Sequence, residues 1–148
     1  MARALGPALL ALALLATGCG GGGASAGAAV SVYAAAPLCK EARSEVQGAG
    51  RQAADLEVRV VCLPPVEAGA GVDLPAAGRN ARRATEDSTS VAYLEAPGSA
   101  AAFSRSIVEA AEVAWIETNS GSTAMRRIRS ALEGDASSPR KAVLDEVG

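Results

Sequence analysis

Short strand-like segments alternate with helical segments along most of this chain, and that alternation limits the folds it can adopt. The strand-like segments are apolar and contain Val, Ile, Tyr or Trp; they span 30–33, 56–63, 90–94 and 113–116. Apolar residues at helical spacing follow each of them. Strands and helices that alternate at these lengths predict an α/β fold with a parallel sheet and helices on both faces.

The connections narrow the topology further. Right-handed crossovers between parallel strands leave few arrangements. With the four strands numbered along the chain, we expect a Rossmann-like open parallel sheet of order 2-1-3-4. The switch point then lies between the first and third strands, where sheets of this kind bind ligands outside the carboxyl ends of their strands. We expect one α/β lobe over 30–148, ending in two helices.

The turn after the third strand is the strongest candidate for a ligand contact. That strand breaks at Pro97-Gly98, and a helix is expected from Ser99 to Ala111. Ser99 suits a helix N-cap, and the free backbone N–H groups behind it suit an anion such as a carboxylate. The alternative is that Ser99 only caps the helix. We expect the buried stripe of this helix to comprise Phe103, Ile107, Ala110 and Ala111.

Composition excludes several classes of function. The chain has 148 residues, no histidine and a formal net charge of −2. Serine–histidine and cysteine–histidine catalysis, and zinc sites with histidine ligands, are therefore excluded within the chain. A near-balanced charge argues against nucleic-acid binding, which favours a basic surface.

An enzyme is not expected either. Glu95, Glu117 and Asp87 lie near strand ends, where carboxylates can do acid–base work. The Gly98-Ser99-Ala100 turn, however, lacks the Gly-x-Ser-x-Gly pattern of a nucleophile elbow. No cofactor fingerprint or metal-ligand cluster appears in the sequence, so we expect no cofactor and no metal. For the three carboxylates near strand ends, the preferred interpretation is that they are solvated.

The N-terminus reads as an export signal. Residues 1–18 combine Arg3 with a Leu/Ala-rich apolar run that is too short for a standard membrane-spanning helix. Small residues then precede Cys19, as in a bacterial lipobox, where cleavage leaves a lipidated cysteine. The alternative is an ordinary signal peptide that happens to carry a cysteine. The Gly/Ala-rich residues 19–29 read as a flexible tether, so we expect an exported protein, lipid-anchored to the outer face of the cell membrane.

Two further cysteines, Cys39 and Cys62, follow the first strand and end the second. If those strands are adjacent and parallel, both sulfur atoms lie at the same sheet edge. Export favours a disulfide between them, which would stabilise the fold by about 3 kcal/mol. Two buried free thiols are the alternative.

Taken in order, several segments resemble one family. They are the lipobox, the Val32-Tyr33 and Pro37-Leu38 opening, 80–84, 91–95, 103–111, 124–128 and 140–145. Together they resemble actinobacterial solute-binding lipoproteins of branched-chain amino acid ABC transporters. The resemblance implies a type 1 periplasmic-binding-protein-like lobe. No single motif is diagnostic; the order of the weak motifs carries the resemblance.

The resemblance also implies a ligand site. In that family, the turns after the third and fourth strands hold the α-carboxylate and α-amino group of an amino acid. Ser99 and Ala100 match the first turn, and Thr118 and Ser120 lie in the second. The implied partners are a Leu-, Ile- or Val-like amino acid, an ABC permease or surface protein, and the membrane through the lipid anchor.

The sequence departs from the family in one large respect. Family members clamp their ligand between two lobes, and most of the second lobe has no counterpart in this sequence. One lobe exposes more of a small ligand than a closed cleft does. We therefore expect ligand binding to be weak or lost, and the alternative function is a membrane-anchored structural or interaction module without solute transport.

Overall fold

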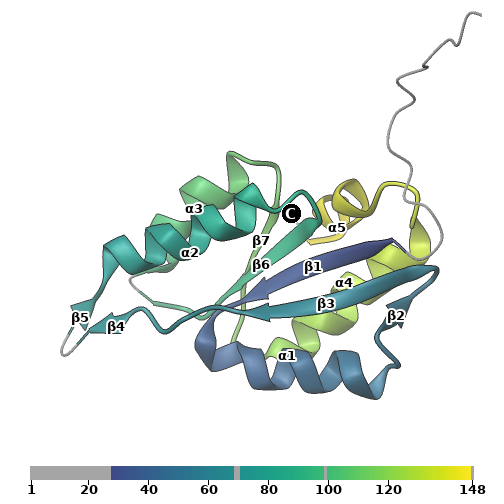
Figure 1. Cartoon of the computed structure of the whole chain (residues 1–148), viewed down its shortest axis with the longest axis horizontal. Helices are drawn as coiled ribbons and strands as arrows, with labels where there is room; N and C mark the ends of the chain where they lie inside the picture. The colour runs from purple at the N-terminus through teal and green to yellow at the C-terminus, as the bar shows by residue number, and fades with distance from the viewer. Residues whose placement is uncertain (1–27, 69–70, 99, 148) are drawn as a thin grey trace, which may run out of the picture.

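In the computed structural model, residues 28–68, 71–98 and 100–147 are described. The predicted signal peptide, Cys19, most of the predicted tether and Ser99 lie outside these residues. The described chain forms a five-stranded mixed sheet of order β2-β3-β1-β6-β7 (Figure 1). Four strands are parallel: β1 (Ala29–Ala34), β3 (Leu56–Cys62), β6 (Ser90–Glu95) and β7 (Ala114–Glu117).

These four are the expected strands, and their order confirms the expected 2-1-3-4 topology. The fifth strand, β2 (Gln52–Ala53), pairs antiparallel with the start of β3 at the sheet edge. The sequence did not predict it. It forms because the chain reverses after the first helix through Gly50 and Arg51, both of which have positive φ.

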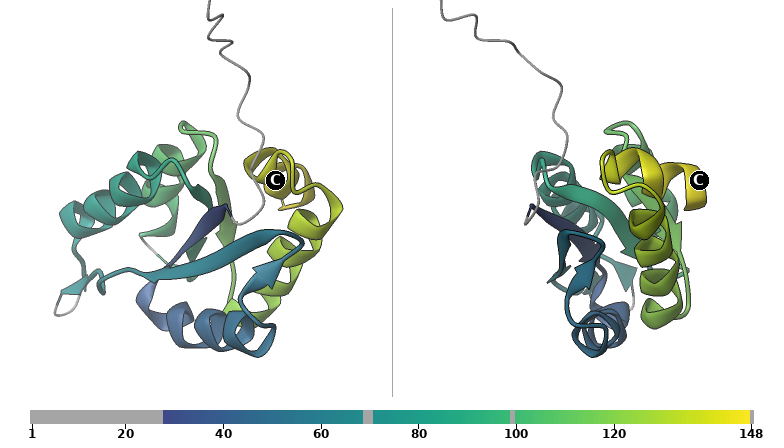
Figure 2. Two further views of the ribbon diagram at one scale, coloured as in Figure 1. Left: turned by 45° about the vertical axis from the view of Figure 1, so that its right-hand side comes forward. Right: turned by 90° about the vertical axis from the view of Figure 1, so that its right-hand side faces the viewer.

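Helices cover both faces of the sheet (Figure 2). The first face carries α1 (Ala36–Gly48), α4 (Gly121–Gly134) and α5 (Pro139–Val147). The opposite face carries α2 (Leu74–Glu86) and α3 (Ala101–Glu109). Within the described residues, none of these helices combines the length and apolar character needed to cross a membrane.

Alternation along the strands divides the core into two layers. Val32, Ala34 and Leu94 pack toward α1, α4 and α5. Tyr33 and Tyr93 pack on the other side, toward α2 and α3. The Tyr33 hydroxyl donates to Asp87 Oδ2 at 2.9 Å. Tyr33 is buried in this second layer, and its burial together with this carboxylate raises its pKa to about 12.

The Pro/Gly/Ala-rich segment between β3 and α2, which the sequence predicts as a loop, contains a small hairpin of β4 (Glu67–Ala68) and β5 (Gly71–Val72). After the hairpin, Asp73 caps α2 by accepting from the Ala76 N–H at 2.9 Å. Two-residue strands are too short to produce the alternating pattern by which strands are recognised in a sequence.

The buried stripe expected for α3 is only partly correct: Ile107 and Ala111 are half-buried and pack against the core, but the other two residues are exposed. Phe103 is 41% exposed, and Ala110 is exposed as well. The buried residues of the helix are Ala101, Ser104 and Val108. The helix turns Ser104 inward because its hydroxyl bonds to a buried carboxylate, and Phe103 lies instead over Gly78 of α2.

Candidate functional site

A cavity of about 370 Å³ lies at the carboxyl ends of β1, β3 and β6. Its walls come from the loops that follow these three strands and from α2. Known small-molecule sites have volumes of about 300–1,000 Å³, so this cavity suits a small solute. It lies at the switch point between β1 and β6, where open α/β sheets bind their ligands.

Most of the cavity wall is apolar. The apolar lining residues are Ala35, Ala36, Pro37, Pro64, Pro65, Val66, Val72, Ala96, Pro97, Gly98 and Ala100. Among the lining residues that the structure describes, four carry polar side-chain groups: Glu67, Asn80, Tyr93 and Glu95. The Asn80 amide donates to the Pro64 carbonyl oxygen at 2.9 Å, which ties α2 to the loop after β3. A largely apolar wall with a few placed polar groups is typical of small-molecule pockets.

Glu95 is the buried charge-bearing residue of this wall. It ends β6 and is only 5% exposed. Ser104 of α3 donates its hydroxyl to Glu95 Oε2 at 3.0 Å, and the Trp115 indole N–H donates to that hydroxyl at 3.3 Å. The Arg105 guanidinium lies 5.1 Å from the Trp115 ring centroid. The carboxylate is thus held by a short chain of side chains from α3 and β7.

Burial raises the pKa of Glu95, and the negative charge of Glu117 raises it further. Glu117 lies directly beside Glu95 in the register of β6 and β7. The hydrogen bond from Ser104 acts in the opposite direction and lowers the pKa, but burial dominates. Burial, followed by the charge of Glu95, also raises the pKa of Tyr93.

The structure places the four predicted ligand residues differently. Ala100 lines the cavity and is 7% exposed, and Ser99 lies outside the described residues. Thr118 and Ser120 are not among the lining residues of this cavity. Thr118 Oγ1 accepts from the Ser120 N–H at 3.1 Å, and Ser120 Oγ accepts from the Thr123 N–H at 3.3 Å to cap α4. Their hydroxyls serve the turn and the cap, and their ligand roles stay a prediction.

Sequence reasoning missed Asn80 and Tyr93 as cavity residues, and it preferred a solvated carboxylate to an acid–base group at Glu95. That expectation is wrong for Glu95, which is buried. One signal was available: Glu95 is a carboxylate at the end of an otherwise apolar strand expected at the sheet centre. A charge in that place is rarely buried without a partner. Asn80 gave a similar signal, since it lies beside the buried Ala81 on α2.

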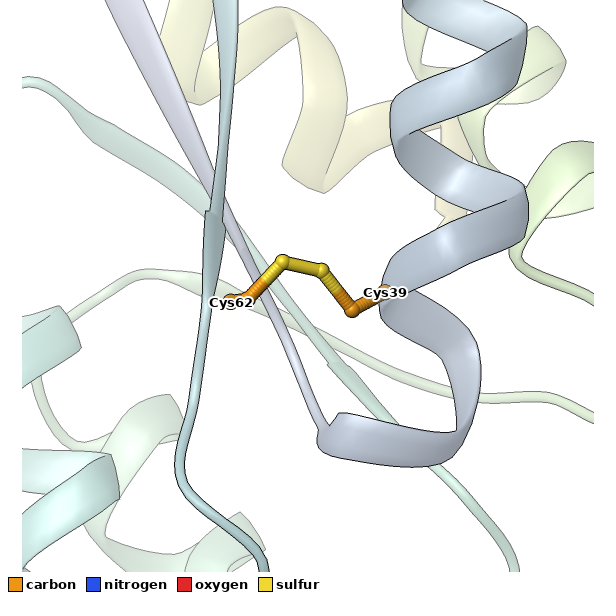
Figure 3. Close-up of a disulfide and its surroundings, with 2 residues drawn as sticks. All are labelled: Cys39 and Cys62. Atoms are coloured by element: carbon orange, nitrogen blue, oxygen red, sulfur yellow. A yellow bond between two sulfur atoms is a disulfide. The ribbon is translucent and has the colours of Figure 1, made fainter.

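Cys39 and Cys62 lie at disulfide distance, with Cα atoms 5.4 Å apart (Figure 3). Cys39 is in the first turns of α1, just after the wall residues 35–37, and Cys62 ends β3, just before the wall residues 64–67. A disulfide here would hold two walls of the cavity together.

Comparisons with known proteins assign the chain to no family. No protein-family model, curated protein or solved structure matches the chain. Because a fold of this class hosts many unrelated functions, the function has to be argued from the cavity and its residues.

The raised pKa of Glu95 gives a pH-dependent stability. The folded state holds this proton more tightly than the unfolded chain. The resulting stabilisation is therefore full below the ordinary pKa of 4.5 and is lost as the pH rises through the folded pKa. Glu95→Gln keeps the shape and removes the titration. We expect the variant to gain stability over wild type with rising pH, by about 1–3 kcal/mol at neutral pH.

Urea denaturation across this pH range measures the difference. Glu117→Gln, at the neighbouring exposed position, is the matched control: it removes only the small contribution of the Glu117 charge to the pKa of Glu95, so its pH profile should depart from wild type far less than that of Glu95→Gln. A gap between Glu95→Gln and wild type that stays constant with pH would show that Glu95 is not buried as a neutral acid.

Proposed function

We propose that this chain binds a small solute in the cavity at the carboxyl edge of its sheet, as a lobe of an exported solute-binding lipoprotein. The position of the cavity carries the proposal: it lies outside the carboxyl ends of β1, β3 and β6, at the switch point of the sheet. The sequence resemblance supports a branched-chain amino acid as the solute, an ABC permease as the partner, and a lipid anchor at Cys19.

The chemistry of the wall suits such a solute. Proline, alanine and valine side chains provide an apolar surface for an aliphatic body. Ala100 lies in the wall at the start of α3, beside the position predicted for Ser99. The Ala101 and Phe103 N–H groups already donate to the Gly98 and Ala100 carbonyl oxygens at 3.1 Å. The positive end of the helix dipole still favours a carboxylate here, so the two ends of an amino acid have candidate partners at Glu95 and at this turn.

A thermal-shift screen against the amino acids at millimolar concentration tests the proposal. A ligand at 100 times its Kd stabilises a protein by about 2.7 kcal/mol. We expect Leu, Ile or Val to raise the Tm, and Ser99→Ala to remove that shift. Ser106→Ala is the matched control, because Ser106 is exposed on α3 and bonds only to the Phe103 carbonyl oxygen among its described contacts. No shift with any amino acid, in a cooperatively folding protein, would contradict the proposal.

A further inference from the structure

We propose that the group of the solute that enters the cavity is a cationic amine and that the Glu95 carboxylate is its counter-ion. This inference rests on the proposed function, because it names the class of ligand taken by the same cavity. The ligand class is a short aliphatic primary amine, either alone or as the α-amino group of an amino acid.

The charges of the cavity carry the inference. Its described lining residues include two carboxylates, Glu67 and Glu95, and neither lysine nor arginine. Over the described part of the chain, the salt bridges use the carboxylates of Glu57, Glu109, Glu133 and Asp145, and none of them reaches Glu95. A buried ionised carboxylate without a cationic partner is costly, and a ligand ammonium group would supply that partner.

Other groups of the cavity and of the neighbouring strand also favour an ammonium group as the ligand. Tyr93 lies on the same strand, Ser104 of α3 bonds to Glu95, and Asn80 and Glu67 line the same cavity. Glu117 of β7 adds a second carboxylate in register. Arg105 is the nearby cation, but it bonds to Glu109 at 2.8 Å and stacks on Trp115. The charged side chains that line this cavity are therefore carboxylates, an arrangement that complements an ammonium group and disfavours a second carboxylate.

The carboxylate is also held in place before a ligand arrives. Ser104 fixes Oε2, and Trp115 in turn fixes Ser104. A group held in its binding position loses little conformational freedom when the ligand binds. The aliphatic body of an amine would rest on wall residues such as Pro37, Pro64 and Val66.

Calorimetric titration of the purified full chain with three probes of one shape tests the charge preference. The probes are 3-methylbutylamine, 3-methylbutanol and 3-methylbutanoate. We expect the amine to bind at least about tenfold more tightly than the alcohol, which corresponds to about 1.4 kcal/mol, and the carboxylate more weakly than either. This comparison uses only the wild-type protein, so it does not depend on whether any variant folds.

The variants then locate the charge. Glu95→Gln should weaken amine binding about tenfold and leave alcohol binding within about twofold. Glu117→Gln, the exposed carboxylate in the same register, should change amine binding by less than about threefold, since an exposed charge acts through water. Amine affinity should rise with pH as Glu95 loses its proton, and this rise should disappear in Glu95→Gln.

The outcomes separate this inference from the proposed function. If leucine binds but the amine binds no better than the carboxylate, the solute site stands and the amine preference is overturned. The same follows if Glu95→Gln, folded by its unfolding transition, binds the amine as wild type does. If neither leucine nor any probe binds, the proposed function fails and this inference fails with it.

Discussion

Replacing Gly121 by alanine should destabilise the protein by about 2–3 kcal/mol. Gly121 begins α4 where that helix crosses α1. A Cβ atom there would fall well inside van der Waals distance of the Leu38 carbonyl oxygen and 2.9 Å from the Ala42 nitrogen. Both are backbone atoms of α1 and cannot rotate away, so the two helices would have to separate.

That separation would break a specific contact between the helices as well. The Glu41 carboxylate of α1 accepts from the Gly121 N–H at 3.1 Å and from the Ser120 hydroxyl at 3.3 Å. It thereby satisfies a free donor at the start of α4. Behind this contact, α4 buries Met125, Ile128 and Leu132 completely in the larger core.

Gly134→Ala is the matched control for this prediction. Gly134 lies in the last turn of the same helix, and a Cβ atom there would have no neighbour within 4 Å. Alanine at this position should be neutral or stabilise by up to about 1 kcal/mol, since glycine costs that much in a helix. Equal urea midpoints for the two variants would show that α1 and α4 do not pack as closely as described.

Removing the Cys39–Cys62 pair should cost about 3 kcal/mol. The two residues are 23 positions apart, and a closed loop of that length restricts the unfolded chain by about that amount. The comparison is best made with Cys19 replaced by serine throughout, which removes the third thiol. The double variant Cys39→Ala/Cys62→Ala should then unfold at a lower urea concentration than its parent.

Reduction provides the matched control for the disulfide. Dithiothreitol should lower the stability of the parent toward that of the double variant and leave the double variant unchanged. Intact mass should rise by about 2 Da in the parent on reduction, since a disulfide gains two hydrogens when it opens. An unchanged mass would identify two free thiols and remove the expected loss of stability.

The main elements of the fold could be predicted because their signals are long and regular. Segments such as 56–63 and 90–94 are apolar enough to be predicted as strands, and right-handed crossovers then limit their order to a few arrangements. On α2, Leu74, Ala77, Ala81 and Ala84 repeat at helical spacing and predict one buried face; the three alanines are fully buried, but Leu74, in the first turn, is 43% exposed. The hairpin formed by β4 and β5 gave no comparable signal, because each strand has two residues.

The site was less accessible to sequence reasoning because its residues are united only by the tertiary structure. The switch point and Ala100 followed from topology and from the family resemblance. The bond between Ser104 and Glu95 did not, because an apolar-stripe rule favours Phe103 over Ser104 on the same helix. Rules based on hydrophobicity alone do not predict polar residues that are buried because they hydrogen-bond to each other.

The most direct test of a solute site at the carboxyl edge is an NMR titration of the ¹⁵N-labelled protein with leucine. We predict that the backbone amide signals of Ala35, Ala36, Ala96 and Ala100, which line the cavity, shift together and saturate. The amides of Glu45, Gly48 and Ser122, which line a separate hollow beside α1, should stay in place. Shifts confined to that hollow, or no shifts at about 10 mM leucine, would contradict a solute site between β1 and β6.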